Sequence, residues 1–221
     1  MRILITAATA AEIMPAQEIW ETLRNQPSCN LQIETAITGV GSTTTAYYTL
    51  KALSSRIESP CDLAINIGIS GSFCESLSIG SVVRIVSDFF GDCGIQTASG
   101  FQSLFEARLI DADTFPFASG KLTPAPLSTQ WESALAFIPV ANGVTVQNLV
   151  EVSHHTHPQL LAQIETMEGA AFFYVCMNER IPCIALRAVS NRVGERDKNR
   201  WNIPLALTEM RKTLACLLYK L

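Results

Sequence analysis

The chain has 221 residues, of which 48% are hydrophobic and 16% are charged, and its formal net charge is −4. This length and apolar content fit one domain with a substantial core, so we expect residues 1–221 to form a single domain. The negative charge leaves no basic field that could neutralise phosphates, which excludes general binding to nucleic acid or to an anionic membrane.

Strands and helices alternate along most of the chain. In chain order, the expected elements are a strand at 2–8, a helix at 15–26, a strand at 31–41, a helix at 42–55 with Ser42 as N-cap, strands at 62–73, 80–90 and 142–150, a helix at 168–180, a strand at 182–191 and a helix at 201–221. This alternation predicts a layered α/β fold with a largely parallel sheet. Residues 91–141 are less regular, and we interpret them as an excursion within the same domain.

The N-terminus and the cysteines favour a cytoplasmic protein. The first apolar run is short and is followed by Glu12 and Pro15, which is typical of a first strand and not of a signal peptide. No apolar run is long enough to span a bilayer. The seven cysteines are scattered without a CxxC pair, as is usual in a reducing compartment.

Five predicted strand ends carry polar residues or glycines. Glu12 follows the first strand, the sequence TGVG (38–41) ends the second and GISG (68–71) ends the third. Glu168 follows a short apolar stretch, and Asn191 ends the last strand. Ligands of open α/β sheets collect at the carboxyl ends of the strands, so these residues predict one shared site.

Each of these features also has a purely structural interpretation. The glycines fit tight turns into helices, and Glu168 fits a helix-capping glutamate. Glu12 is either an acid at a helix N-terminus or a general base, and Asn191 is either a turn residue or an amide that binds a heterocycle. A carboxylate at position 168 beside small residues is also suited to accept hydrogen bonds from two neighbouring hydroxyls, such as those of a ribose.

The three histidines, His154, His155 and His157, lie together in a polar stretch before Pro158. Their spacing matches no common metal-binding frame, so we predict a solvated turn and no metal site. We also predict no cofactor.

Several of these motifs resemble those of the purine nucleoside phosphorylase/nucleosidase superfamily. The resemblance is carried by Glu12, TGVG, GISG, MEGAA (167–171) and RAVSN (187–191), in this order along nearly the whole chain. Within the superfamily, MEGAAFF and SNRVGERDKNRW (190–201) are most similar to the futalosine hydrolases of menaquinone biosynthesis. The resemblance implies a three-layer α/β/α sandwich with a central mixed sheet, cleavage of an N-glycosidic bond, and a homodimer or larger homo-oligomer.

The resemblance also implies a role for each site residue. Glu12 activates water, Met167 packs on the ribose, and Glu168 accepts hydrogen bonds from its 2′ and 3′ hydroxyls. Asn191 holds the leaving base. The remaining substrate contacts are expected from Gly71 near the sugar and base, from Leu149 and Val150 as walls of the base site, and from Arg196.

Asn191 bears on the identity of the base. In the related methylthioadenosine/adenosylhomocysteine nucleosidases an aspartate stands at this place, where it can accept from a 6-amino group. An asparagine amide can instead donate to the O6 atom of hypoxanthine and accept from a protonated N7. Asn191 therefore favours a 6-oxopurine, and the resemblance implies hydrolysis of futalosine to hypoxanthine and dehypoxanthine futalosine.

Three further predictions concern the nucleophile, the tail of the substrate and the role of Arg187. Asn66 stands where some phosphorylases of the superfamily carry an arginine, which favours water over phosphate as the nucleophile. Futalosine carries a carboxyphenyl tail, which one of Arg192, Arg196 and Arg200 could bind, unless these side chains are solvated and paired with neighbouring acids. Arg187 lies in an apolar strand and is expected to support a neighbouring acid without touching the substrate.

Other functions are compatible with the same motifs. The enzymatic alternatives are a methylthioadenosine/adenosylhomocysteine nucleosidase and a purine nucleoside phosphorylase. A protein that binds nucleosides without cleaving them is the alternative from a different class, and the presence of both Glu12 and Glu168 argues against it.

Overall fold

The computed structural model describes the whole chain except residues 28, 56–59, 99, 150–161 and 196. Within the described residues, seven strands form the main sheet in the order β10-β9-β4-β11-β3-β1-β2. Their bounds are β1 Arg2–Ala7, β2 Gln32–Ile37, β3 Leu63–Ser72, β4 Val82–Ser87, β9 Val140–Thr145, β10 Ile164–Thr166 and β11 Cys183–Arg192.

The sheet is mixed, as predicted. Strands β1, β2, β3 and β11 run parallel to one another, and β4, β9 and β10 also form parallel pairs. The pairs β11–β4 and β10–β3 are antiparallel. Because β10 pairs with both β9 and β3, the sheet folds back on itself at the end where β3 and β11 finish.

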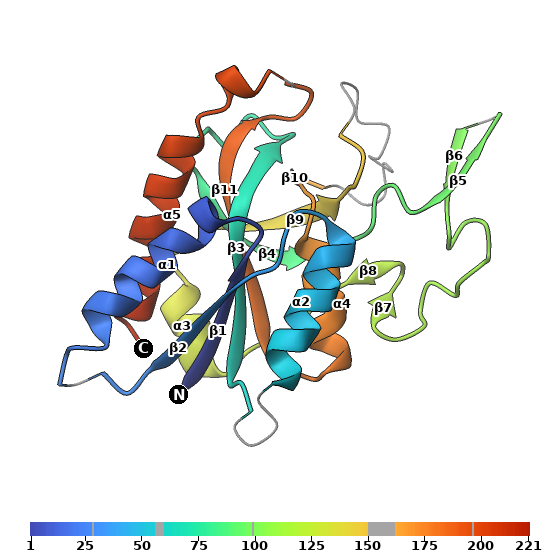
Figure 1. The fold of residues 1–221 in the computed structure, drawn as a ribbon. Helices are drawn as coiled ribbons and strands as arrows, with labels where there is room; N and C mark the ends of the chain where they lie inside the picture. Colours follow the sequence, from blue (N-terminus) through green and yellow to red (C-terminus); the bar gives the residue numbers. More distant parts are fainter. Residues whose placement is uncertain (28, 56–59, 99, 150–161, 196) are drawn as a thin grey trace.

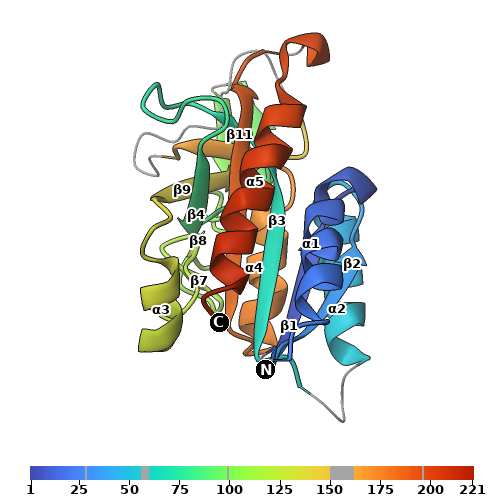
Figure 2. The same cartoon turned by 90° about the vertical axis from the view of Figure 1, so that its left-hand side faces the viewer.

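Helices cover both faces of the sheet, which gives the predicted three layers (Figures 1 and 2). Side chains of α1 (Ala10–Leu23), α3 (Thr129–Leu135) and α5 (Ile203–Leu218) share one buried cluster with the sheet. On the opposite face, α4 (Gly169–Asn178) contributes Phe172 and Phe173 to a second cluster, and α2 (Ser42–Ser54) packs beside α4.

Strand β11 shows why the apolar runs are continuous. Ile184 and Leu186 point into the cluster with α1 and α5, whereas Cys183 and Ala185 point into the cluster with α4. Successive side chains of a strand face opposite sides of the sheet, so both faces of a covered strand favour apolar side chains, as over residues 183–186.

Three local predictions were wrong. Helix α1 begins at Ala10 and not at Pro15, because Thr9 caps it: its hydroxyl accepts from the Glu12 N–H at 3.3 Å. Ser42 is the first residue of α2 and not its cap, since Gly41 occupies the N-cap position. The GISG sequence is not a turn but the last part of β3, where pairing with β10 and β11 keeps the backbone extended.

The irregular stretch 91–141 contains two small hairpins and α3. The hairpins are β5 (Gly94–Thr97) with β6 (Gly100–Ser103), and β7 (Phe117–Ala118) with β8 (Lys121–Leu122). The first of them projects away from the helices in Figure 1. In the described part of the chain, no helix is both long enough and apolar enough to cross a membrane.

Candidate active site

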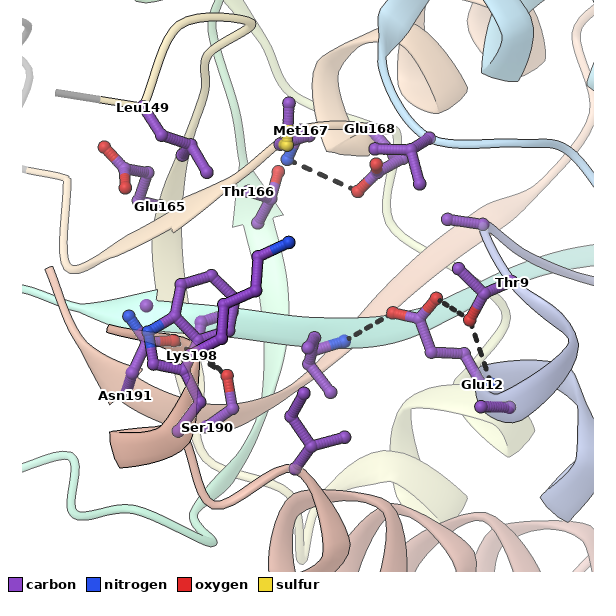
Figure 3. A pocket seen from close by; sticks show the side chains of 18 of the residues that line it. Thr9, Glu12, Leu149, Glu165, Thr166, Met167, Glu168, Ser190, Asn191 and Lys198 are labelled. Carbon is purple, nitrogen blue, oxygen red and sulfur yellow. Dashed lines mark hydrogen bonds between the residues drawn. The ribbon is translucent and has the colours of Figure 1, made fainter. Parts of the chain in front are cut away.

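A cavity of about 340 Å³ lies where β1, β3 and β11 end, at the carboxyl edge of the parallel strands. Six predicted site residues line it together: Glu12, Gly71, Leu149, Met167, Glu168 and Asn191. Two others, Val150 and Arg196, lie outside the described residues, as do the three histidines. The prediction that distant strand ends meet at one cleft is therefore confirmed for Glu12, Gly71, Glu168 and Asn191. Figure 3 shows Glu12, Glu168 and Asn191 around this cavity.

Glu12 is held in place by a backbone and a hydroxyl donor. The Ile69 N–H donates to its Oε1 atom at 3.1 Å, and the Thr9 hydroxyl donates to its Oε2 atom at 2.7 Å. Its Oε1 atom also lies against Gly68, where a Cβ atom would be only 3.1 Å away. The carboxylate is buried, with 9% of its residue surface exposed, yet it borders the cavity. It is thus oriented for contact with a ligand or a water molecule.

Glu168 stands at the N-cap position of α4 but does not cap the helix. Its carboxylate instead accepts from the Gly41 N–H at 3.0 Å and from the Met167 N–H at 3.3 Å. The interpretation of Glu168 as a capping glutamate is therefore wrong. The TGVG turn, with positive φ angles at Gly39 and Gly41, brings a backbone donor from a distant segment to this side chain.

Two threonines cap α4 in place of Glu168. The Gly169 N–H donates to the Thr166 hydroxyl at 3.2 Å, and the Ala170 N–H donates to the Thr145 hydroxyl at 2.8 Å. The Thr145 hydroxyl in turn donates to Asp88 at 3.1 Å. These contacts satisfy the first amides of the helix, which leaves the Glu168 carboxylate available to the cavity.

A buried arginine compensates for the acids on this side of the sheet. Arg187 is 1% exposed and donates to the carbonyl and side-chain oxygens of Asn66. Burial raises the pKa of Glu168 and raises that of Asp88 to about 7, and the charge of Arg187 opposes both shifts. Arg187 does not line the cavity, in agreement with the expectation that it supports an acid without touching the substrate.

Asn191 reaches the cavity because β11 contains a bulge. The pairing of β11 with β3 shifts between Val189 and Asn191, so that Asn191 and not Ser190 lies opposite Gly71. The amide Oδ1 accepts from the Ser190 hydroxyl at 2.8 Å, and Nδ2 donates to the Arg192 carbonyl at 2.9 Å. An amide has two donor hydrogens and two acceptor lone pairs, so one of each remains for a ligand.

Sequence reasoning missed several residues that line the cavity, among them Thr9, Glu165, Lys198 and Trp201. One of them carried a recognisable pattern: Thr9 and Glu12 have the T-x-x-E spacing of a helix start.

Of the three arginines that were candidates for binding an acidic group of the substrate, the structure describes Arg192 and Arg200. Arg192 donates to the carbonyls of Cys74, Glu75 and Leu77 and so holds a loop. Arg200 pairs with Glu195 at 3.1 Å and is exposed. Among the described residues that line the cavity, Lys198 is the one with a cationic side chain.

Fold and site agree with one class of protein. The model of the phosphorylase superfamily matches residues 32–220, and the chain belongs to this family. A protein of Streptomyces coelicolor named futalosine hydrolase is 32% identical over 156 residues, which cover 68% of this chain and 63% of that protein. The futalosine hydrolase of Thermus thermophilus is 29% identical over 188 residues, which cover 82% of this chain and 79% of that one. The match thus spans less than two thirds of the Streptomyces protein.

Solved structures share the fold at low sequence identity. The futalosine hydrolase of Helicobacter pylori superposes with a TM-score of 0.77 at 16% identity, covering 100% of this chain and 98% of that chain. A 5′-methylthioadenosine/S-adenosylhomocysteine nucleosidase of the same organism gives a TM-score of 0.77 at 16% identity, with 100% and 99% covered.

Proposed function

We propose that this protein is a nucleosidase that hydrolyses the N-glycosidic bond of futalosine and releases hypoxanthine and dehypoxanthine futalosine. The observation that carries the proposal is the meeting of Glu12, Glu168 and Asn191 at one cavity. The volume of about 340 Å³ suits a small-molecule ligand. The futalosine hydrolases among its sequence relatives support the choice of substrate.

The proposed mechanism is dissociative. The bond between C1′ and N9 stretches first, and positive charge develops on the ribose. Glu168 accepts hydrogen bonds from the 2′ and 3′ hydroxyls and stabilises this charge, while Met167 packs on the sugar. Glu12 orients the water molecule that attacks C1′ and takes its proton, so that the water oxygen stays on C1′. Asn191 holds the leaving hypoxanthine, which gains one proton in place of its bond to C1′, so that one water is consumed in total.

The described surroundings of the cavity favour water over phosphate as the nucleophile. A phosphate dianion needs several cationic or amide donors, and Lys198 is the one described cation at the cavity wall. Asn66 is buried against Thr6 and Arg187 and does not border the cavity. It therefore supports the position of Arg187 and offers nothing to a nucleophile.

Lys198 is our candidate for the carboxylate of the substrate tail. Its side chain is exposed, lines the cavity and extends into the open space in Figure 3. It replaces Arg192 and Arg200 in this role, since both are committed to other partners. Arg196 stays a second candidate.

A comparison of substrates tests the proposed function. We expect free hypoxanthine from futalosine in the absence of phosphate, followed by chromatography. Adenine release from methylthioadenosine would support the methylthioadenosine/adenosylhomocysteine nucleosidase alternative, and a strict requirement for phosphate would support a phosphorylase. Binding of futalosine and methylthioadenosine without base release would indicate a binding protein.

We further propose that the chain forms a homodimer or larger assembly in the cytoplasm. Tyr47, Tyr48 and Leu50 of α2 are 60%, 44% and 41% exposed, and a second copy could cover them. Light scattering of the purified protein tests this assembly, and a monomer at micromolar concentration would contradict it.

A further inference from the structure

Gln147 lies just beyond the end of β9 and connects two other segments through its side-chain amide. Its Oε1 atom accepts from the Ser42 N–H at 2.8 Å. Its Nε2 atom donates to the Met167 carbonyl at 3.0 Å and to the Ser42 hydroxyl at 2.9 Å. Gln147 is not among the residues that line the cavity, so it can act on the site only through these segments.

The contacts of Gln147 lie on both sides of Glu168. The Gly41 N–H donates to the Glu168 carboxylate at 3.0 Å, and the Ser42 N–H is the next amide along the chain. The Met167 carbonyl belongs to the residue that directly precedes Glu168. Gln147 therefore links the turn that donates to the carboxylate with the backbone that carries the carboxylate. The first amides of α2 have no cap from its own N-cap residue, which is a glycine, and these contacts satisfy two of them.

The position of Gln147 is itself fixed from two directions. The Asp92 carboxylate accepts from the backbone N–H groups of Gln147 and Asn148, the second at 2.8 Å. On the other side, the turn approaches so closely that a Cβ atom at Gly41 would lie only 2.7 Å from Gln147 Oε1. Gln147 is exposed, but its side chain is held by several contacts and does not depend on one of them.

We propose that Gln147 is a positioning residue, which keeps the Gly41 N–H directed at the carboxylate of Glu168. This inference rests on the proposed nucleosidase function and extends it to a side chain that does not touch the substrate. Without the amide of Gln147, the Ser42 N–H and the Met167 carbonyl would bind water, and the turn would be free to move away from Glu168. A hydrogen bond of this kind contributes about 0.5–1.5 kcal/mol.

The protonation of Glu168 reports on this arrangement. Burial raises the pKa of Glu168, the charge of Arg187 and the Gly41 N–H lower it, and the charge of Glu12 raises it. The buried Asp88 is a further acid whose charge interacts with Glu168. A carboxylate that loses a donor to its ionised form has a higher pKa. Loss of the glutamine should therefore raise the pKa of Glu168 further, which a purely structural role would not do.

Replacement of the amide by a thioether tests the proposal. Gln147→Met keeps the length of the side chain but has neither the donor nor the carbonyl oxygen. We expect kcat/KM for futalosine to fall about tenfold, the range of one lost hydrogen bond, and the acidic limb of the pH profile of kcat to move to higher pH. The matched control is Gln163→Met, because Gln163 accepts from the Asn142 N–H at 3.1 Å outside the cavity. This control should keep both the rate and the pH profile.

Amide hydrogen exchange of Gly41, followed by NMR, provides a test that needs no substrate. We expect the Gly41 N–H to exchange about tenfold faster in Gln147→Met than in the parent. An unchanged exchange rate of Gly41, or an unshifted pH profile in the folded variant, would overturn the assignment, whatever the loss in rate. If the parent cleaves no nucleoside but Gly41 exchanges faster in the variant, the proposed function fails and the positioning of Gly41 by Gln147 stands.

Discussion

The two sides of the cavity are built in different ways. On the proposed sugar side, at Glu12 and Glu168, each carboxylate accepts from a backbone N–H of a distant segment, Ile69 in one case and Gly41 in the other. On the proposed base side, at Asn191, the geometry follows from the shifted register of β11 against Gly71 of β3.

We propose that the sugar side serves catalysis and that the base side selects between substrates. Backbone donors do not change with the side chain, so the sugar side offers the same geometry to any ribonucleoside. We propose that on the base side a side-chain group, the Asn191 amide, contacts the part of the substrate that differs between purines. Changes on the sugar side should lower all rates, whereas changes on the base side should alter the preference between substrates.

The largest effect is expected for Glu168→Gln. The variant keeps an acceptor for the Gly41 N–H but loses the negative charge that stabilises the transition state, so kcat/KM should fall about a thousandfold for every nucleoside. Steady-state kinetics with futalosine and its 6-amino analogue measure this loss. Glu179→Gln, at the exposed end of the same helix, should retain full activity. Near-normal turnover in folded Glu168→Gln would remove Glu168 from the mechanism.

Glu12→Gln should have the next largest effect. An amide cannot take the proton of the attacking water, and general-base catalysis contributes about a hundredfold or more to a rate. We expect kcat to fall by about this factor with little change in KM. Glu21→Gln, an exposed acid on the same helix, is the control, and equal losses in the two variants would argue against a special role for Glu12.

Asn191→Asp should change the preference more than the rate. A protonated aspartate can accept from a 6-amino group, so the rate for the 6-amino analogue relative to futalosine should rise about tenfold. Competition between the two substrates in one reaction measures this ratio directly. An unchanged ratio together with a large loss for both substrates would place Asn191 among the catalytic groups and weaken the comparison between the two sides.

Thr145→Val probes the support of the sugar side. The valine has nearly the same shape but cannot accept from the Ala170 N–H, so we expect a loss of about 1–2 kcal/mol in unfolding free energy. Since Glu168 immediately precedes this helix, kcat should also fall several-fold. Denaturant titration and kinetics on the same preparation test both effects. Full kcat in the destabilised variant would show that the cap matters for stability alone.

The last prediction concerns the pH dependence of the stability of Asp88→Asn, with no change expected in substrate preference. Burial raises the pKa of Asp88 from 3.8 to about 7, so the folded protein holds a proton that the unfolded chain releases. The corresponding stabilisation is complete below pH 3.8 and is lost as the pH rises through about 7. The amide of the variant does not titrate, so the stability of the variant relative to the parent should increase over this interval. Denaturant unfolding at several pH values measures it, and a constant difference would contradict the raised pKa.

Much of the fold follows from short-range patterns. Continuous apolar runs at the positions of β1, β3 and β11 indicated strands covered on both faces, and all three are in the central sheet. The rule that ligands collect at strand ends then brought Glu12, Glu168 and Asn191 to one site before any contact was known. The same patterns were misleading at GISG, because glycine in a strand and glycine in a turn look alike in a sequence.

The sequence alone thus determined the alternation of elements, the burial of the strands and the residue types available at their ends. Only the tertiary structure decided which of these groups face each other. Two features show this dependence. The bulge at Ser190 depends on the register between β11 and β3, and the capping of α4 depends on Thr145 and Thr166, which come from other strands. Local periodicity specifies the face on which a side chain lies, but the register between distant strands specifies its neighbour, and a shift by one residue would turn each side chain to the opposite face.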